Sequence, residues 1–134
     1  MPIGRLHHTI VDCPDPHRLA EFYARLLDLP VTYADDDFAV VSRDDRTSGL
    51  AFQRSPDQRP PTWPDPAVPQ QIHLDVMVED VAAATPRVLA LGATKLAGDD
   101  VFAEVGSKHL GSADLRKVFP GHEASAAKFR GLLG

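Results

Sequence analysis

The chain has a single cysteine, few aromatic residues and no long apolar run. Cys13 cannot form an internal disulfide, so a reducing cytoplasm is the expected location. Apolar runs are short, as in Phe38–Val41, and none is long enough to span a bilayer. The opening residues include Arg5, His7 and His8 and do not have the pattern of a secretory signal. These absences predict a cytoplasmic protein that does not enter the membrane.

Positive charge is also scarce, with 14 Lys and Arg against 19 Asp and Glu and a net charge of −5. No basic stripe is present that could follow a phosphate backbone, so nucleic-acid binding is not expected. Arginine outnumbers lysine and alanine is frequent, a bias associated with GC-rich bacterial genomes. The length of 134 residues, with 43% hydrophobic and 25% charged residues, is typical of one globular domain.

The first half of the chain predicts one strand, one helix and three further strands. Residues 6–13 form the first strand, and Asp15 caps a helix whose first position is Pro16. Pro30 ends that helix, because the residue before a proline is steered away from helical geometry. An apolar stripe at helical spacing supports it, made of Leu19, Phe22, Tyr23, Leu26 and Leu27. The three short strands follow at about 31–34, 38–42 and 49–54.

The same order begins again after a proline-rich segment, in which six of the 12 prolines lie between Pro56 and Pro69. Residues 71–78 predict a strand, and residues 81–91 predict a helix that Gly92 ends. Two starts are open for this helix: Asp80 as the cap with a kink at Pro86, or Thr85 as the cap of a shorter helix. The two copies align 65 residues apart, which matches His8 with His73, Asp15 with Asp80, and Tyr23 with Val88.

We therefore predict a duplication within a single domain that spans residues 1–134. Module one covers residues 5–55 and module two covers residues 71–120. A semi-rigid, proline-rich linker joins them at residues 56–70. A C-terminal helix is expected at about 122–133.

Strand alternation predicts which side chains face each helix. In the second copy, the helix-facing residues are Ile72, Leu74, Val76 and Val78, and the other face carries His73, Asp75 and Met77. In the first copy, the helix-facing residues are His7, Thr9, Val11 and Cys13, and the other face carries His8, Ile10 and Asp12. Cys13 is then expected to be an inert core residue. The matched histidines, His8 and His73, would converge wherever the two copies face each other.

These patterns resemble the vicinal oxygen chelate superfamily, which comprises glyoxalase I, bleomycin-resistance proteins, fosfomycin-resistance proteins and extradiol dioxygenases. The first module of that family is similar to Leu6–Val11, Asp15, Phe22–Tyr23 and Leu26–Pro30, and its second module to residues 73–93. The resemblance implies an α+β fold, with two tandem βαβββ modules forming a cup-shaped mixed sheet and helices on the outer face.

The resemblance also implies a divalent metal in the cup, held by His8 and His73 and by a carboxylate. Imidazole suits Fe, Mn, Ni, Co or Zn. In the last strand of module one, Ala51 stands where some members place a ligating glutamate. The usual glutamate of module two is not found, and Glu104 and Glu123 are candidates by chemistry alone. Two imidazoles without a carboxylate leave the site incomplete.

Other candidates belong to the same cup. Ile10, Gln53, Trp63 and Met77 are expected to contact a substrate. Asp75, beside His73, would act as a catalytic base if burial raised its pKa, or would only make a structural hydrogen bond.

Two functions follow. One is metal-assisted lyase, isomerase or dioxygenase chemistry on a small oxygenated molecule. The alternative is metal-free sequestration of a small molecule, as in bleomycin-resistance proteins, which is motivated by Ala51 and by the absent glutamate. Under either function the partners expected are a small-molecule ligand and a second copy of the chain in a homodimer.

Overall fold

The computed structural model describes residues 1–62, 65–69, 72–97, 101–103 and 111–117 of the chain. The chain divides into two compact units, residues 1–58 and 59–134. Each unit mixes helix and strands, so the predicted α+β class is confirmed. The single domain and the joint cup stay predictions, and the expected C-terminal helix at 122–133 lies outside the described residues.

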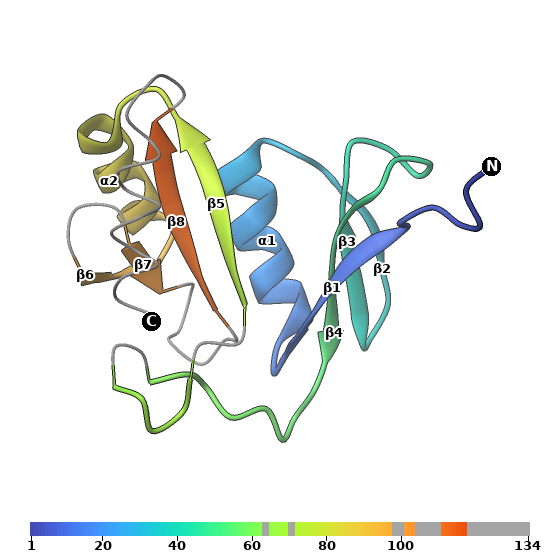
Figure 1. The fold of residues 1–134 in the computed structure, drawn as a ribbon, viewed down its shortest axis with the longest axis horizontal. Coiled ribbons are helices and arrows are strands. Elements are labelled where there is room, and N and C mark those ends of the chain that lie inside the picture. Colours follow the sequence, from blue (N-terminus) through green and yellow to red (C-terminus); the bar gives the residue numbers. More distant parts are fainter. Residues whose placement is uncertain (63–64, 70–71, 98–100, 104–110, 118–134) are drawn as a thin grey trace. The chain divides into compact units, whose positions relative to one another are not determined.

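The first unit contains one helix and a four-stranded sheet (Figure 1). The strand order is β1-β4-β3-β2; β1 runs parallel to β4, and the other neighbours are antiparallel. The order strand, helix and three strands is the one that the sequence predicts for residues 5–55. The elements are β1 (His8–Cys13), α1 (Pro16–Leu27), β2 (Val31–Ala34), β3 (Phe38–Val41) and β4 (Gly49–Arg54).

Helix α1 starts and ends as the sequence predicts. The side chain of Asp15 accepts a hydrogen bond from the Arg18 amide at 3.1 Å, and Pro16 occupies the first turn. The C-cap, Asp28, has a φ of 53°, in the left-handed region, and its amide donates to the Ala24 carbonyl. The helix therefore ends before Pro30.

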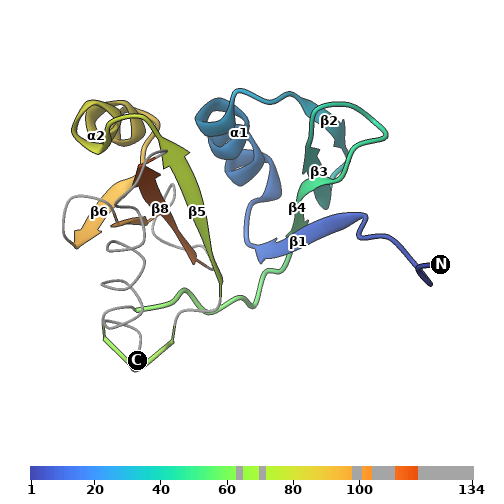
Figure 2. The same cartoon turned by 45° about the horizontal axis from the view of Figure 1, so that its top comes forward.

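The core of the first unit lies between α1 and the sheet (Figure 2). Tyr23 of α1 is fully buried and stacks on Phe52 of β4, with ring centroids 5.6 Å apart. Val11 and Cys13 are buried, whereas Ile10 is half exposed, so the predicted alternation of β1 is confirmed for these residues. Val11 and Cys13 thus face the core, and Ile10 and Asp12 face the other side of the sheet.

The second unit has the same strand order, β5-β8-β7-β6, with β5 parallel to β8. Val76 is buried while Asp75 and Met77 are exposed, as the alternation predicts. The sequence did not predict β8, because its small and charged residues lack the apolar pattern of a strand. The elements are β5 (Ile72–Val78), α2 (Val81–Ala90), β6 (Thr94–Ala97), β7 (Val101–Ala103) and β8 (Gly111–Lys117).

The start of α2 decides between the two caps that the sequence left open. Asp80 accepts hydrogen bonds from the amides of Ala82 and Ala83, so it is the N-cap, and Pro86 lies inside the helix. Thr85 instead donates its hydroxyl hydrogen to the Val81 carbonyl at 2.8 Å. The helix thus contains Pro86 rather than starting at it.

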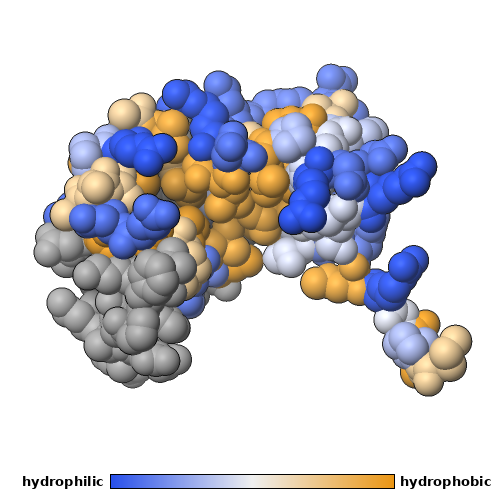
Figure 3. All heavy atoms as spheres, turned by 90° about the horizontal axis from the view of Figure 1, so that it is seen from above, coloured by the Kyte–Doolittle hydropathy of each residue, from blue (hydrophilic) through white to orange (hydrophobic). Residues whose placement is uncertain are grey.

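Neither described helix combines the length and the apolar character needed to cross a bilayer. The chain before Leu6 extends away from the rest of the first unit, on the side where the N-terminus is marked in Figure 1, and it is also seen in Figure 3. Met1, Ile3 and Leu6 are exposed. The first strand of the unit begins at His8.

Candidate functional site

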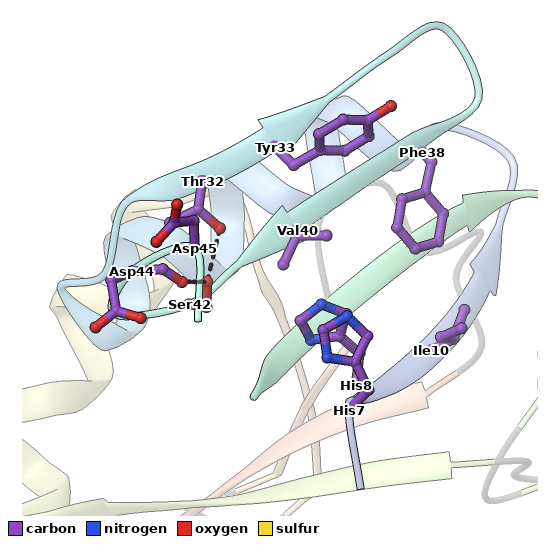
Figure 4. A pocket seen from close by; sticks show the side chains of 10 residues that line it. All are labelled: His7, His8, Ile10, Thr32, Tyr33, Phe38, Val40, Ser42, Asp44 and Asp45. Carbon is purple, nitrogen blue, oxygen red and sulfur yellow. Dashed lines mark hydrogen bonds between the residues drawn. The ribbon is translucent and has the colours of Figure 1, made fainter. Parts of the chain in front are cut away.

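An open cavity of about 490 Å³ lies on the first unit's sheet (Figure 4). His8 and Ile10 line it from β1, whereas Val11 and Cys13 of the same strand face the core. The cavity is therefore on the face of the sheet opposite α1. Its lining residues are His7, His8, Ile10, Thr32, Tyr33, Phe38, Val40, Ser42, Asp44 and Asp45.

A β-bulge in β2 shapes one wall of the cavity. Val31 pairs with Val41 and Tyr33 pairs with Val40, so Thr32 is an extra residue on this strand. Both Thr32 and Tyr33 then line the cavity, which regular alternation would not allow.

The two hydroxyl groups at this wall, of Thr32 and Ser42, donate their hydrogens to acceptors within the protein. The buried Ser42 donates its hydroxyl hydrogen to the Asp44 carbonyl at 2.7 Å. The Thr32 hydroxyl lies 2.6 Å from that of Ser42, and must be the donor because the Ser42 hydrogen is already used. This end of the cavity is therefore polar, but neither hydroxyl has a hydrogen left to donate to a bound molecule.

Another part of the lining is aromatic, with one ring from β2 and one from β3. Tyr33 and Phe38 have ring centroids 6.4 Å apart at 60°. The Tyr33 hydroxyl donates to Asp35 at 2.8 Å, and this bond to a carboxylate raises the pKa of Tyr33 and lowers the pKa of Asp35. Tyr33 therefore contributes its ring to the cavity, and its hydroxyl remains protonated.

His8 lies in the cavity with one ring nitrogen engaged. The Gly49 amide of β4 donates to its Nδ1, at an N···N distance of 3.2 Å. Partial burial, and then the nearby His7, lower the pKa of His8. The ring is therefore held in its neutral form.

His7 corrects one prediction. Alternation placed it on the helix side with Val11, but it is exposed and lines the cavity, where its ring lies against that of His8 with centroids 3.8 Å apart and planes tilted by 35°. The reason is that β1 begins at His8, so His7 precedes the strand and the alternation of β1 does not extend to it.

The other predicted residues have varied surroundings. Ile10 lines the cavity, and Ala51 is buried in register between Ile10 and Val40. Gln53 is exposed in register with Asp12, further along the strand, and is not part of the cavity lining. Trp63, Glu104 and Glu123 lie outside the described residues.

In the second unit, the predicted residues lie together on β5. His73 Nε2 is 3.6 Å from an oxygen of Asp75, and Met77 is half exposed. The register opposes Ser112 to His73 and Asp114 to Asp75. Asp114 thus occupies the register position that Ala51 occupies in the first unit, and the sequence missed it because β8 was not predicted. The convergence of His8 with His73 stays a prediction.

The described side chains do not fit the metal that the resemblance implies. Among the described residues, no group of three or more His, Cys, Asp or Glu residues could hold an ion. His8 itself does not fit, because its Nδ1 lone pair accepts the Gly49 N–H. The neutral ring then carries its hydrogen on Nε2, so neither nitrogen has a lone pair for a metal.

Comparison with known proteins supports the architecture. A family model described as a glyoxalase-like domain matches residues 8–106. A possible glyoxalase from Bacillus cereus has a TM-score of 0.57 at 16% identity, over 85% of this chain and 98% of that one. The trypanothione-dependent glyoxalase I of Leishmania major has a TM-score of 0.56 at 16% identity, over 96% of each chain. An integron cassette protein of V. cholerae has a TM-score of 0.55 at 13% identity, over 89% of this chain and 98% of that one. No curated protein matches the sequence.

Proposed function

Because the chain belongs to the glyoxalase-like domain family, we propose that it binds a small molecule in the cavity of the first unit, without a metal ion on His8. The observation that carries this proposal is the cavity itself. Its volume of about 490 Å³ is within the range of ligand pockets, roughly 300–1,000 Å³. Four of its ten lining side chains, Ile10, Tyr33, Phe38 and Val40, form an apolar and aromatic surface, and the polar side chains converge beside it, a combination found in ligand sites.

The charges at the cavity favour a neutral or cationic ligand. Asp44 and Asp45 both line it. Hydrogen bonds from the Thr47 side chain and from the amides of Arg46 and Thr47 lower the pKa of Asp44, so this carboxylate is ionised at neutral pH. Two carboxylates at the rim would repel an anion.

Binding without turnover, as in the bleomycin-resistance branch of the family, fits these groups better than metal-assisted chemistry. A metal-assisted enzyme needs ligand atoms that His8 does not offer while the Gly49 amide donates to its Nδ1. The proposal retains the homodimer and the cytoplasmic location that the sequence predicts. Gel filtration of the full chain tests the dimer.

The test is a titration of neutral aromatic ketones, acetophenone among them, monitored by NMR on the full chain. Phe38→Ala removes one wall of the cavity and should weaken binding about fivefold, because contact with a Phe ring contributes on the order of 1 kcal/mol. Val31→Ala is the matched control, since Val31 is half exposed on β2 but does not line the cavity.

Two results would contradict the proposal. One is equal affinity for the ketones in wild type and Phe38→Ala. The other is turnover of the bound molecule that requires Fe, Mn, Ni, Co or Zn and stops when a chelator is added.

A further inference from the structure

We propose that His8 is a hydrogen-bond donor to the bound molecule, through Nε2–H, and that it selects a flat, apolar molecule carrying a carbonyl oxygen. This inference rests on the proposed function, because it assigns the ligand class of the same cavity. It also assigns to His8 a role different from the metal ligation that the resemblance implies.

The position of the hydrogen on His8 follows from the Gly49 contact. A backbone amide nitrogen can donate but cannot accept, so the atom that it approaches at 3.2 Å must be an acceptor. That atom is Nδ1, and a neutral imidazole with an acceptor at Nδ1 has its hydrogen at Nε2. The Gly49 amide thereby fixes the tautomer of His8.

The backbone holds the Gly49 amide in place. A Cβ atom at residue 49 would lie 2.2 Å from the Val41 carbonyl oxygen and 2.6 Å from the Ser42 Cβ, so only glycine allows β3 and β4 to approach this closely. Nearby, the Ser48 hydroxyl donates to the Leu6 carbonyl at 2.7 Å and ties the segment before β4 to the segment before β1. The donor to His8 is therefore part of the packing of the sheet.

The Nε2–H group of His8 can donate a hydrogen bond to a bound molecule, whereas the hydroxyl groups of the cavity cannot. The hydroxyls of Tyr33, Thr32 and Ser42 are committed to Asp35, Ser42 and Asp44. Among the described residues, Nε2 of His8 has no hydrogen-bond partner. His8 is also less exposed than His7, the other imidazole of the cavity, so an unpaired donor costs more at His8.

The walls around this donor suit a flat apolar molecule. The rings of Tyr33 and Phe38 lie across the cavity from the histidines in Figure 4, and Ile10 and Val40 complete the apolar surface. Both carboxylates of the lining disfavour an anionic acceptor such as a carboxylate. In a neutral aromatic ketone, the carbonyl oxygen accepts the hydrogen bond from His8, and the aromatic ring packs against the apolar walls.

The first experiment needs no ligand. Long-range ¹H–¹⁵N correlation on the full chain, at a pH where His8 is neutral, should show the hydrogen on Nε2 and none on Nδ1. His8→Gln assigns the signals by their disappearance. A hydrogen on Nδ1 would overturn the inference, as would stoichiometric binding of Zn or Ni that His8→Gln abolishes.

The second experiment compares two probes of similar shape, acetophenone and ethylbenzene, of which only the first has a carbonyl oxygen. The ratio of their Kd values should shift by about 2- to 10-fold against acetophenone in His8→Phe, the effect of one net hydrogen bond. His8→Gln, which keeps an N–H donor, should restore much of that ratio. His17→Phe, at an exposed histidine of α1 outside the cavity, should leave it unchanged.

The outcomes separate this inference from the proposed function. If both probes shift the resonances of Tyr33 and Phe38 but His8→Phe leaves the ratio unchanged, the donor role is wrong and the binding cavity stands. If neither probe shifts those resonances, the proposed function fails and the ligand class fails with it.

Discussion

The two units share a strand order and a matched histidine, but the two imidazoles have different neighbours. His8 accepts a hydrogen bond from the amide of Gly49, the residue paired with it on β4. His73 lies 3.6 Å from the carboxylate of Asp75 on its own strand, and Ser112 is paired with it on β8. A repeat in the sequence thus preserves the backbone position of a histidine without preserving its chemistry. At His8, the backbone amide across the parallel strand pair determines which ring nitrogen is the acceptor.

The two helices also carry different side chains at matched positions. Tyr23 on α1 and Val88 on α2 lie 65 residues apart, at positions that the sequence alignment of the two halves matches, and both are buried. Tyr23 stacks on Phe52 and contacts the edge of Phe22, whereas Val88 has a small side chain on a helix that contains Pro86. The first unit therefore depends on one large aromatic cluster, and the helix of the second unit buries a smaller side chain at the same place.

Truncation of the matched core residues should have the largest effect. Tyr23→Ala should lower the free energy of opening of the first unit by about 3–5 kcal/mol, because it leaves a cavity beside Phe52. Val88→Ala should lower that of the second unit by only about 2 kcal/mol. Amide hydrogen exchange, followed separately in β4 and β5, measures both. Equal losses would show that the aromatic cluster is not the main support of the first unit.

Substitution of Gly49 comes next in size. Gly49→Ala forces a shift of the β3 end, since its Cβ would overlap the Val41 carbonyl, and should cost about 1–3 kcal/mol in urea unfolding. It should also weaken the hydrogen bond to Nδ1 and so allow the other tautomer of His8. Gly4→Ala is the matched control, because a Cβ there meets nothing within 4 Å. Unchanged stability and tautomer in Gly49→Ala would contradict the role assigned to this glycine.

Much of the fold was predictable, because local signals determine it. The Asp15 cap and the alternation over residues 10–13 and 75–77 depend on residues adjacent in sequence, and the structure confirms them. Asp80 was one of two caps that the sequence left open for the second helix. Strand β8 was not predictable, because residues 111–117 form a strand only by pairing with β5 and β7, which are distant in sequence.

The site was predictable only in part, for the same reason. His8 and Ile10 follow from alternation and line the cavity. Thr32 and Tyr33 line it together because of a bulge, which depends on the register with β3 and leaves no signal in the sequence of β2. The Gly49 amide was missed because a backbone donor has no residue type that marks it. A sequence can indicate that His8 faces a cavity, but the partner of its ring nitrogen depends on long-range packing.

Removal of the helix caps should have a smaller and similar effect in both units. Asp15→Ala and Asp80→Ala should each cost about 1 kcal/mol, the usual contribution of an N-cap. The loss at Asp80 should be the larger of the two, because its carboxylate accepts from two amides and that of Asp15 from one. Hydrogen exchange in α1 and α2 measures each loss, and the isosteric Asn variants, which keep an acceptor, are the controls. A larger loss at Asp15 would show that the second amide bond contributes nothing.

The smallest expected effect is a pH dependence that belongs to the first unit. Burial, and then His7, lower the pKa of His8 from its ordinary value of 6.5. Between the lowered pKa of the folded protein and the ordinary pKa of the unfolded chain, the unfolded chain binds more protons, so stability must rise with pH in that window. Above about pH 6.5 both states are neutral at this residue, and the contribution is constant.

Urea midpoints measured across this range should therefore fall as the solution is acidified below pH 6.5. His8→Gln should flatten that part of the profile, because Gln keeps an acceptor for the Gly49 amide and does not titrate. If His8→Gln instead left the slope unchanged, other groups would carry the pH dependence, and the neutral ring would not be a stabilising feature of the cavity.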